Sequence, residues 1–487
     1  MTVKATLMDK LRQIEKAIAA DPCQPVFYNT LGNRLRQLAR FDEAMNAYQK
    51  ALALNENYAE AHTNIGILLT ALEKENEAIY HLKKAIIINP DLSPALNQLA
   101  DIYLRQGKYA DARDLFLQSL EKTPENCDIN HRLGIAYFKL RDFENAQYQF
   151  ENVLIVDHKY PEVNQYLANT LLEMGEHEKA MTYYFRQLEL NPFFETNYNL
   201  GVLFMMKERL NEALMYFDQA LLTEPNNLAT HLNCGNIFLK KNNIEKAIIC
   251  YEKANTLKPD DLETQHILFA LKQEKTPDCA PKDYVTHLFD QYAPYYDHHL
   301  TEALKYDAPQ KMFQCVQMEN PKLFDMRWKI LDLGCGTGLC GALFKPLASE
   351  LIGIDLSENM LSAASSKNIY DKLIANDIAE ALPLFSQVDL ICAADVFTYV
   401  GDLELTFKLA ANTLLPNGLF IFTVEKTNEK NFILQTSIRY AHSKAYLSSV
   451  IANHSFEVIS FENIQLRKQK NQPVEGYLVL LKKLIVA

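Results

Sequence analysis

Residues 330–338 read Ile-Leu-Asp-Leu-Gly-Cys-Gly-Thr-Gly, and this stretch decides the fold of the C-terminal half. The apolar run 328–333 predicts a buried strand, and an apolar helical pattern begins at Leu339. Between them stand three glycines at alternate positions, Gly334, Gly336 and Gly338. Glycine permits positive φ and a close approach of ligand to main chain, so we expect a strand, a ligand-binding turn and a helix.

A second strand at 351–354 ends in Asp355, which completes a βαβ unit with an acid placed to hold ribose hydroxyls. The spacing differs from the G-x-G-x-x-G of dinucleotide sites, because Leu339 takes the place of the third glycine. Asp332 would repel a pyrophosphate, but it suits the ammonium group of an amino acid. The residues therefore argue against NAD, which stays an alternative together with a βαβ unit that binds no ligand.

Segment 330–338 closely resembles motif I of the class I S-adenosylmethionine (SAM)-dependent methyltransferases, and 353–357, Gly-Ile-Asp-Leu-Ser, resembles their acidic-loop segment. The resemblance implies S-adenosyl-L-methionine as cofactor. The residues expected to bind it in these two segments are Asp332, Gly334, Cys335, Gly336, Gly338, Asp355 and Leu356.

Strands and helices alternate after Asp355. We expect strands at 372–375, 388–393 and 419–424, helices at 403–415 and 444–453, and a closing antiparallel pair at 457–466 and 477–481. This order resembles the α/β, Rossmann-like, seven-stranded methyltransferase sheet. Such sheets bind their ligand at the C-terminal ends of the strands.

Polar residues follow the third and fourth strands of this sheet. By resemblance to the family, Asp377 accepts a hydrogen bond from the adenine amino group and Ile378 packs on the ring. Asp395 and Tyr399 lie in the region that faces the methyl group and the substrate in the family, so they are candidate catalytic residues, with Ala394 and Phe397 beside them. The structural alternatives are a helix cap or loop carboxylate for Asp395 and core packing for Tyr399.

An aromatic segment at 288–300 precedes the glycine loop, and Pro294 should split it into two helices. It is similar to the F-D-x-Y-A-x-x-Y-D lid found before motif I in many methyltransferases. By that resemblance Tyr292, Tyr295 and Tyr296 contact the methionine part of SAM, whose sulfonium aromatic faces attract. Packing in the core is the alternative for these tyrosines.

His442 is a third candidate catalytic residue, as a base on the substrate side. The alternative is that Ser443 caps the helix at 444–453 and His442 is merely adjacent. No zinc or magnesium pattern occurs in the sequence, so no metal site is expected.

The first half of the chain repeats with a period of 34 residues, with one step of 33. A small residue is followed 12 positions later by alanine and 4 positions after that by an aromatic residue or leucine. The small residues are Gly32, Gly66, Ala100, Gly134, Ala168, Gly201 and Gly235. The pattern is similar to the tetratricopeptide repeat (TPR), a pair of antiparallel helices. We expect an all-α superhelix of half a repeat, seven full repeats and a capping helix at 262–274.

A TPR stack has a concave groove that binds peptides. The first-helix positions that usually face it include Arg36, Asn97, His131 and Phe138, a mixture that suits an extended peptide backbone. The dense Lys/Arg set that binds chaperone tails is missing. The expected partner is therefore a protein or peptide held by the groove.

Composition excludes several classes of function. The net charge of −12 argues against nonspecific nucleic-acid binding, and no apolar run is long enough for a membrane helix. Nine scattered cysteines and an N-terminus without a signal core suit the cytoplasm. The oligomeric state stays open.

The sequence thus predicts a TPR array over 1–274, a linker over 275–282 and a SAM-dependent methyltransferase domain over 283–487. The array would recruit a protein or peptide that is itself a candidate substrate. Two alternatives stay open: a TPR interaction protein with a non-catalytic methyltransferase-like domain, and a methyltransferase that acts on a small molecule. Neither the methyl acceptor nor the atom that is methylated follows from the sequence.

Overall fold

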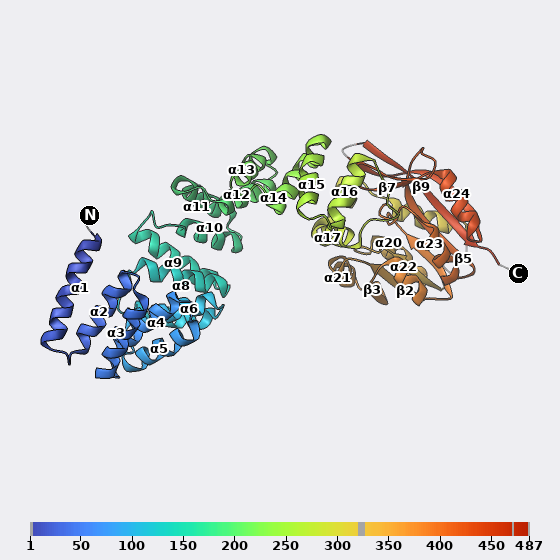
Figure 1. The fold of residues 1–487 in the computed structure, drawn as a ribbon. Coiled ribbons are helices and arrows are strands. Elements are labelled where there is room, and N and C mark those ends of the chain that lie inside the picture. Colours follow the sequence, from blue (N-terminus) through green and yellow to red (C-terminus); the bar gives the residue numbers. More distant parts are fainter. Residues whose placement is uncertain (1–2, 320–326, 470–471, 486–487) are drawn as a thin grey trace. The chain divides into compact units, whose positions relative to one another are not determined.

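The computed structural model describes residues 3–319, 327–469 and 472–485, and the chain divides into two compact units, Met1–Pro225 and Asn226–Ala487. The first unit is all helical, and the second joins three further helices of the array to an α/β domain (Figure 1). In the described part of the chain, no helix combines the length and the apolar character that a bilayer crossing demands.

The helices of the first unit form one leading helix and six antiparallel pairs. They are α1 (Val3–Ala20), α2 (Pro25–Gln37), α3 (Phe41–Leu54), α4 (Ala59–Ala71), α5 (Glu75–Ile88), α6 (Ser93–Arg105), α7 (Tyr109–Leu120), α8 (Cys127–Lys139), α9 (Phe143–Val156), α10 (Val163–Glu173), α11 (His177–Leu190), α12 (Phe194–Met206) and α13 (Leu210–Thr223). The second unit begins with the seventh pair, α14 (Leu228–Lys240) and α15 (Ile244–Leu257), followed by the capping helix α16 (Leu262–Lys272). The order of these helices is the one expected for half a repeat, seven pairs and a cap.

In each pair of helices, the small residue on the first helix packs against the aromatic residue or leucine on the second. A Cβ added to Gly134 on α8 would lie 2.6 Å from the ring of Phe150 on α9, and one added to Gly201 would lie equally close to Phe217. The helices therefore approach to contact distance, and the aromatic ring fills the space that a side chain would take. Polar bonds join successive pairs, as where the amide of Asn64 donates to Asn29 Oδ1 over 2.9 Å.

The α/β domain contains nine strands among the described residues. They are β1 (Trp328–Leu333), β2 (Ala348–Asp355), β3 (Lys372–Ala375), β4 (Val388–Ala393), β5 (Leu414–Lys426), β6 (Phe432–Leu434), β7 (Tyr440–His442), β8 (Phe456–Gln469) and β9 (Gln472–Lys483). The helices are α17 (Lys282–Tyr292), α18 (Tyr296–His298), α19 (Ala308–Glu319), α20 (Leu339–Phe344), α21 (Glu358–Ser366), α22 (Ile378–Ala381), α23 (Glu404–Thr413) and α24 (Lys444–Asn453). Pro294 lies in a 3-10 turn that separates α17 from α18, so the predicted break is present.

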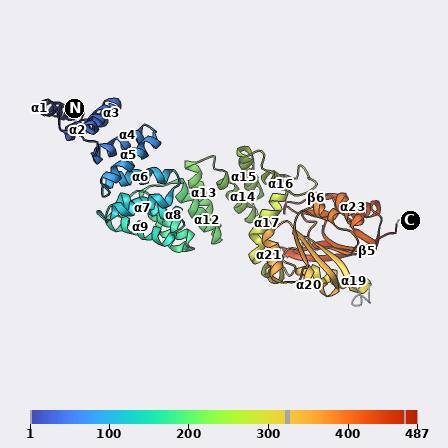
Figure 2. The same cartoon turned by 90° about the horizontal axis from the view of Figure 1, so that it is seen from below.

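The main sheet runs β3-β2-β1-β4-β5-β9-β8, with β1 to β5 parallel and the last two strands antiparallel. This is the predicted seven-stranded arrangement. The hairpin of β6 and β7 was not predicted, and it pairs with the end of β5. Helices cover both faces of the sheet (Figures 1 and 2), since Leu331 packs in a cluster with α23 and α24 while its neighbour Ile330 packs with α19 and α20.

The segment between α16 and α17 is bonded to the α/β domain. The carbonyl of Asp278 accepts hydrogen bonds from the backbone N–H groups of Gly401 and Asp402, each 2.8 Å, and Ala280 N donates to the carbonyl of Tyr399 over 2.9 Å. On α16 itself, the side chain of Gln273 donates to the carbonyl of Leu434 over 2.8 Å. The residues predicted as a linker thus form an ordered strap against the loop that follows β4. The domain boundaries at 274 and 283 stay a prediction.

Replacing Gly134 by valine is expected to destabilise the repeat array, because the new side chain must displace the ring of Phe150. Overpacking of this kind costs about 1–3 kcal/mol in the free energy of unfolding, which urea titration followed by circular dichroism measures. Gly175 is the matched control, since nothing lies within 4 Å of its added Cβ and asparagine tolerates its φ of +76°. Equal losses for Gly134→Val and Gly175→Asn would contradict the proposed contact.

Candidate functional site

The glycine loop turns the chain at the C-terminal end of β1. Gly334, Gly336 and Gly338 all have positive φ, at 58°, 52° and 90°. A Cβ on Gly334 would lie 2.5 Å from Val396, so both the dihedral and the packing there require glycine. Cys335 N donates to the carbonyl of Ile354, which ties the loop to β2.

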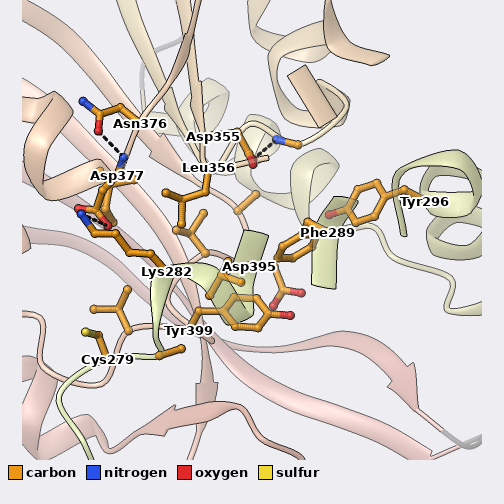
Figure 3. A pocket seen from close by; sticks show the side chains of 18 residues that line it. Cys279, Lys282, Phe289, Tyr296, Asp355, Leu356, Asn376, Asp377, Asp395 and Tyr399 are labelled. Carbon is orange, nitrogen blue, oxygen red and sulfur yellow. Dashed lines mark hydrogen bonds and ion pairs between the residues drawn. The ribbon is translucent and has the colours of Figure 1, made fainter. Parts of the chain in front are cut away.

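A pocket opens beside this loop at the C-terminal edge of the parallel strands (Figure 3). Its lining includes ten residues that the sequence nominated: Tyr296, Gly334, Gly336, Asp355, Leu356, Asp377, Ile378, Ala394, Asp395 and Tyr399. The lining is completed by Cys279, Ala280, Lys282, Val285, Phe289, Asn376, Val396 and Val400. The ends of β1 to β4 thus meet in one cavity, as the topology of a parallel sheet requires.

Seven nominated residues lie outside that lining: Tyr292, Phe397 and five others. The Asp332 carboxylate points behind the loop, where it accepts a bond of 2.6 Å from the hydroxyl of Tyr370, and Cys335 is buried in the packed interior. Gly338 caps the start of α20, and Tyr295 is 69% exposed. None of these four residues lines the pocket, so their contacts with a cofactor stay a prediction.

His442 is the fifth of these residues. It is fully buried, and its Nε2 lies 2.9 Å from the carbonyl of Gly401. Burial lowers the pKa of His442 to about 4. Ser443 caps α24, with its side chain accepting from Tyr446 N. The structural alternative for this segment describes it better than the catalytic one.

Asp355 is oriented by the backbone. Its Oδ2 accepts from Gly336 N and its Oδ1 accepts from Ser357 N, both at 2.9 Å. Burial raises the pKa of Asp355, and the backbone N–H groups that bind the carboxylate oppose this shift. The carboxylate is therefore fixed at the end of β2, beside the loop.

Asn376 and Asp377 follow β3. Asp377 caps the short helix α22, since its Oδ1 accepts from Ala379 N over 2.8 Å, and its own N–H donates to Asn376 Oδ1 over 2.8 Å. Lys282 reaches the same side of the pocket from α17, where its ammonium lies 3.9 Å from Asp377 Oδ2 (Figure 3). The same ammonium pairs with Glu380.

Asp395 belongs to a network of four charges. Arg467, on β8 and only 2% exposed, donates from Nη1 to both oxygens of Asp395, at 3.0 and 3.1 Å, and from Nη2 to Glu425 on β5. Arg439 lies 3.7 Å from Asp395 and 3.8 Å from Glu425. Asp395 has φ of 61°, a left-handed conformation that its loop and this network maintain. Two cations and two anions balance one another at this wall of the pocket.

Aromatic rings close the pocket over Asp395. Phe289 on α17 lies edge-on to Tyr399, with centroids 5.3 Å apart, and 6.1 Å from Tyr296. Burial raises the pKa of the phenols of Tyr399 and Tyr296. Phe397, a candidate from the sequence, is instead fully buried in the core against Phe422.

Sequence reasoning missed the residues contributed by the strap and by α17. Val285 and Phe289 stand four residues apart on one helical face, a spacing that predicts a buried contact but not its partner. Cys279 and Ala280 belong to a segment whose two prolines favoured a linker. Glu425 and Arg467 had no local signal, because strand pairing alone brings them to Asp395.

Family models match both parts of the chain. One described as a methyltransferase domain matches residues 331–422. Others described as TPR or tetratricopeptide repeats match 32–72, 69–132, 162–194 and 228–261. The chain therefore combines tetratricopeptide repeats with a methyltransferase domain, as its motifs predict.

Curated relatives share a limited part of the chain. The ubiquinone biosynthesis O-methyltransferase of Rhodopseudomonas palustris is 30% identical over 109 residues, which are 22% of this chain and 43% of that protein. The biotin biosynthesis bifunctional protein BioHC of Saccharophagus degradans is 33% identical over 99 residues, 20% of this chain and 18% of that protein. The chain thus spans less than half the length of these two relatives. Among solved structures, MamA is 21% identical with a TM-score of 0.31, over 33% of this chain and 94% of MamA.

Asp332→Asn is expected to change how stability depends on pH. Burial raises the pKa of Asp332 to about 7, so its contribution to stability is present below the unfolded pKa of about 3.9 and is lost as the pH rises through 7. Asparagine cannot ionise and still accepts from Tyr370. The free energy of unfolding of the variant, relative to wild type, should rise by about 1.4 kcal/mol per pH unit between pH 5 and 7 in urea titrations. A difference that stays constant over this range would show that Asp332 ionises normally.

Proposed function

We propose that the chain is a SAM-dependent methyltransferase whose repeat array holds a protein or peptide partner. The observation that carries the proposal is the carboxylate of Asp355, fixed by Gly336 N–H beside an open cradle of main chain. A carboxylate in this position suits the paired hydroxyls of a ribose, which it accepts by charge-assisted bonds.

The chemistry of the lining fits the rest of the donor molecule. Asp377 and Asn376 offer acceptors to an adenine amino group, and Ile378 and Leu356 offer apolar surface to the ring. Tyr296, Asp395 and Tyr399 lie at the side where the family resemblance puts the methyl group. SAM supplies a sulfonium, an excellent leaving group, so the protein mainly aligns the reactants and excludes water.

Three alternatives remain distinguishable from this proposal. A non-catalytic domain in an interaction protein would bind neither donor nor product. A small-molecule methyltransferase would bind both and would use the repeats for another purpose. A dinucleotide site would prefer NAD, but the loop in this chain has Leu339 where that site needs a glycine.

The repeat array also carries unsatisfied polar atoms at predicted groove positions. Arg36 Nε, Asn97 Oδ1 and His131 Nε2 are buried and have no hydrogen-bond partner among the described residues. Buried polar groups are nearly always paired in proteins, so these side chains have hydrogen-bonding capacity that a bound partner could use after a change of rotamer.

S-adenosylhomocysteine, the product of SAM, tests the donor site by titration calorimetry. Wild type should bind it with micromolar affinity and should not bind NAD. Asp355→Asn should weaken binding at least about tenfold, because the amide loses the charge that strengthens the ribose bonds. Asp389→Asn is the matched control, since Asp389 stands at the opposite end of β4 and accepts from Lys329 N. A folded wild-type protein without affinity for S-adenosylhomocysteine would refute the enzyme proposal.

Peptides selected from a random library on the immobilised full chain test the groove. Asn97→Ala should weaken a selected peptide, because it removes an acceptor that has no other partner in the described structure. Glu121→Ala, at the C-terminal end of α7, serves as an exposed control. If the selected peptides bind Asn97→Ala as tightly as wild type, the partner binds at another surface.

A further inference from the structure

A second pocket adjoins the proposed donor site. It is lined by Leu288, Gln291, Tyr292, His299, Leu304, Arg439, Arg467 and Lys468, which come from α17, the segment 299–304, the residue before β7 and the end of β8. Three cationic side chains and one histidine line it, and no acidic residue is among the described residues of its lining.

The two pockets share one wall. Three pairs of side chains form it, and in each pair one member lines the second pocket and the other lines the first. The rings of Tyr292 and Tyr296 are 5.1 Å apart, Arg467 Nη1 bonds Asp395, and the guanidinium of Arg439 lies 5.8 Å from the ring centre of Tyr399. A molecule in the second pocket would therefore face the side of the first at which we expect the methyl group.

The two arginines of this wall differ in what they already bind. Arg467 is buried and bonds both Asp395 and Glu425, so its role is structural. Arg439 is 27% exposed, and its side chain makes no hydrogen bond within the described structure; its buried Nη1 lies 3.7 Å from Asp395 and 3.8 Å from Glu425 in ion pairs. A guanidinium has five donors in a planar fork that matches a carboxylate, and in Arg439 those of Nε and Nη2 form no hydrogen bond within the described structure.

We propose that Arg439 binds the carboxylate of the methyl acceptor, so that the acceptor is a carboxylic acid and its product a methyl ester. This rests on the proposed function. Leu288 and Leu304 in the same lining would contact an apolar part of the acceptor next to the carboxylate. The acceptor is either a free carboxylic acid or a carboxylate carried by a peptide.

The transfer to a carboxylate balances without a proton. One carboxylate oxygen forms the new O–CH3 bond with its own lone pair, the S–CH3 bond breaks, and its electron pair returns to sulfur. The anionic acceptor and the cationic donor give a neutral ester and a neutral thioether. No base is needed, which agrees with the wall itself: both oxygens of Asp395 are bonded to Arg467, and burial raises the pKa of Tyr399.

The binding test uses the full-length protein with hexanoate and its neutral counterpart hexanamide. Calorimetry should detect hexanoate, with and without saturating S-adenosylhomocysteine, and should detect no hexanamide. Arg439→Gln should weaken hexanoate at least tenfold and change the affinity for S-adenosylhomocysteine less than threefold, while Arg439→Lys should retain part of the affinity. Arg209→Gln is the charge-matched control, since Arg209 pairs with Glu212 in the N-terminal unit and lines neither pocket.

A second arm distinguishes the source of the carboxylate. The peptide acetyl-Gly-Glu-Gly-amide replaces hexanoate, and acetyl-Gly-Gln-Gly-amide replaces hexanamide. Preference for the glutamate peptide over hexanoate would assign a peptide-borne acceptor, and the reverse preference a free acid. Both outcomes support the carboxylate site.

Product analysis completes the test. With SAM labelled in the methyl group, the acceptor that reacts should release labelled methanol in alkali, as methyl esters do. Hexanamide binding equal to hexanoate, unchanged hexanoate affinity in Arg439→Gln, or an alkali-stable methylated product would each overturn the proposal. Failure of the donor site has a separate signature, because hexanoate would then still bind while S-adenosylhomocysteine would not.

Discussion

The hydrogen bond from Gly336 N to Asp355 couples the two loops on which the proposed donor site depends. The amide can face the end of β2 only because Gly334 and Gly336 adopt positive φ, and the turn is tied a second time where Cys335 N meets Ile354. This arrangement leaves main chain, and not side chains, at the bottom of the pocket. A ligand can then approach the main chain closely without displacing a side chain. The Asp355 carboxylate is held in its orientation by the 2.9 Å hydrogen bond from Gly336 N.

The parts of the site that the sequence predicted are those whose signal is local. Gly334, Gly336 and Asp355 could be recognised from the sequence, because the glycine spacing and the acid at the end of the second strand lie within a single βαβ unit. Asp377 and Asp395 follow from the same logic, since parallel strands end at one edge of a sheet. The helix pairs of the repeats could also be predicted, because each contact, such as that of Gly134 with Phe150, lies within one 34-residue unit.

The parts that escaped prediction depend on distant pairing. Arg467 meets Asp395 across 72 residues of sequence, through a register of β8 on β9 and β9 on β5 that no local pattern specifies. His442 shows the converse: a titratable residue that the sequence places near the site is fully buried and does not line the pocket. Cysteine, alanine and proline at 279–281 are the residues of an ordinary connection, and the backbone bonds of Asp278 and Ala280 reveal that the connection is packed.

That packed connection also limits how such a chain can change its length. The segment from Gln273 to Ala280 is bonded at one end to Leu434 on β6 and at the other to the loop that follows β4. Inserting or deleting a residue there would shift the bridge between Cys279 and Val400, two residues that line the pocket. Repeats earlier in the array carry their contacts within themselves and with their neighbours. Gain or loss of whole repeats before α14 would therefore leave these bonds intact, whereas the last pair and its cap belong to the same compact unit as the α/β domain.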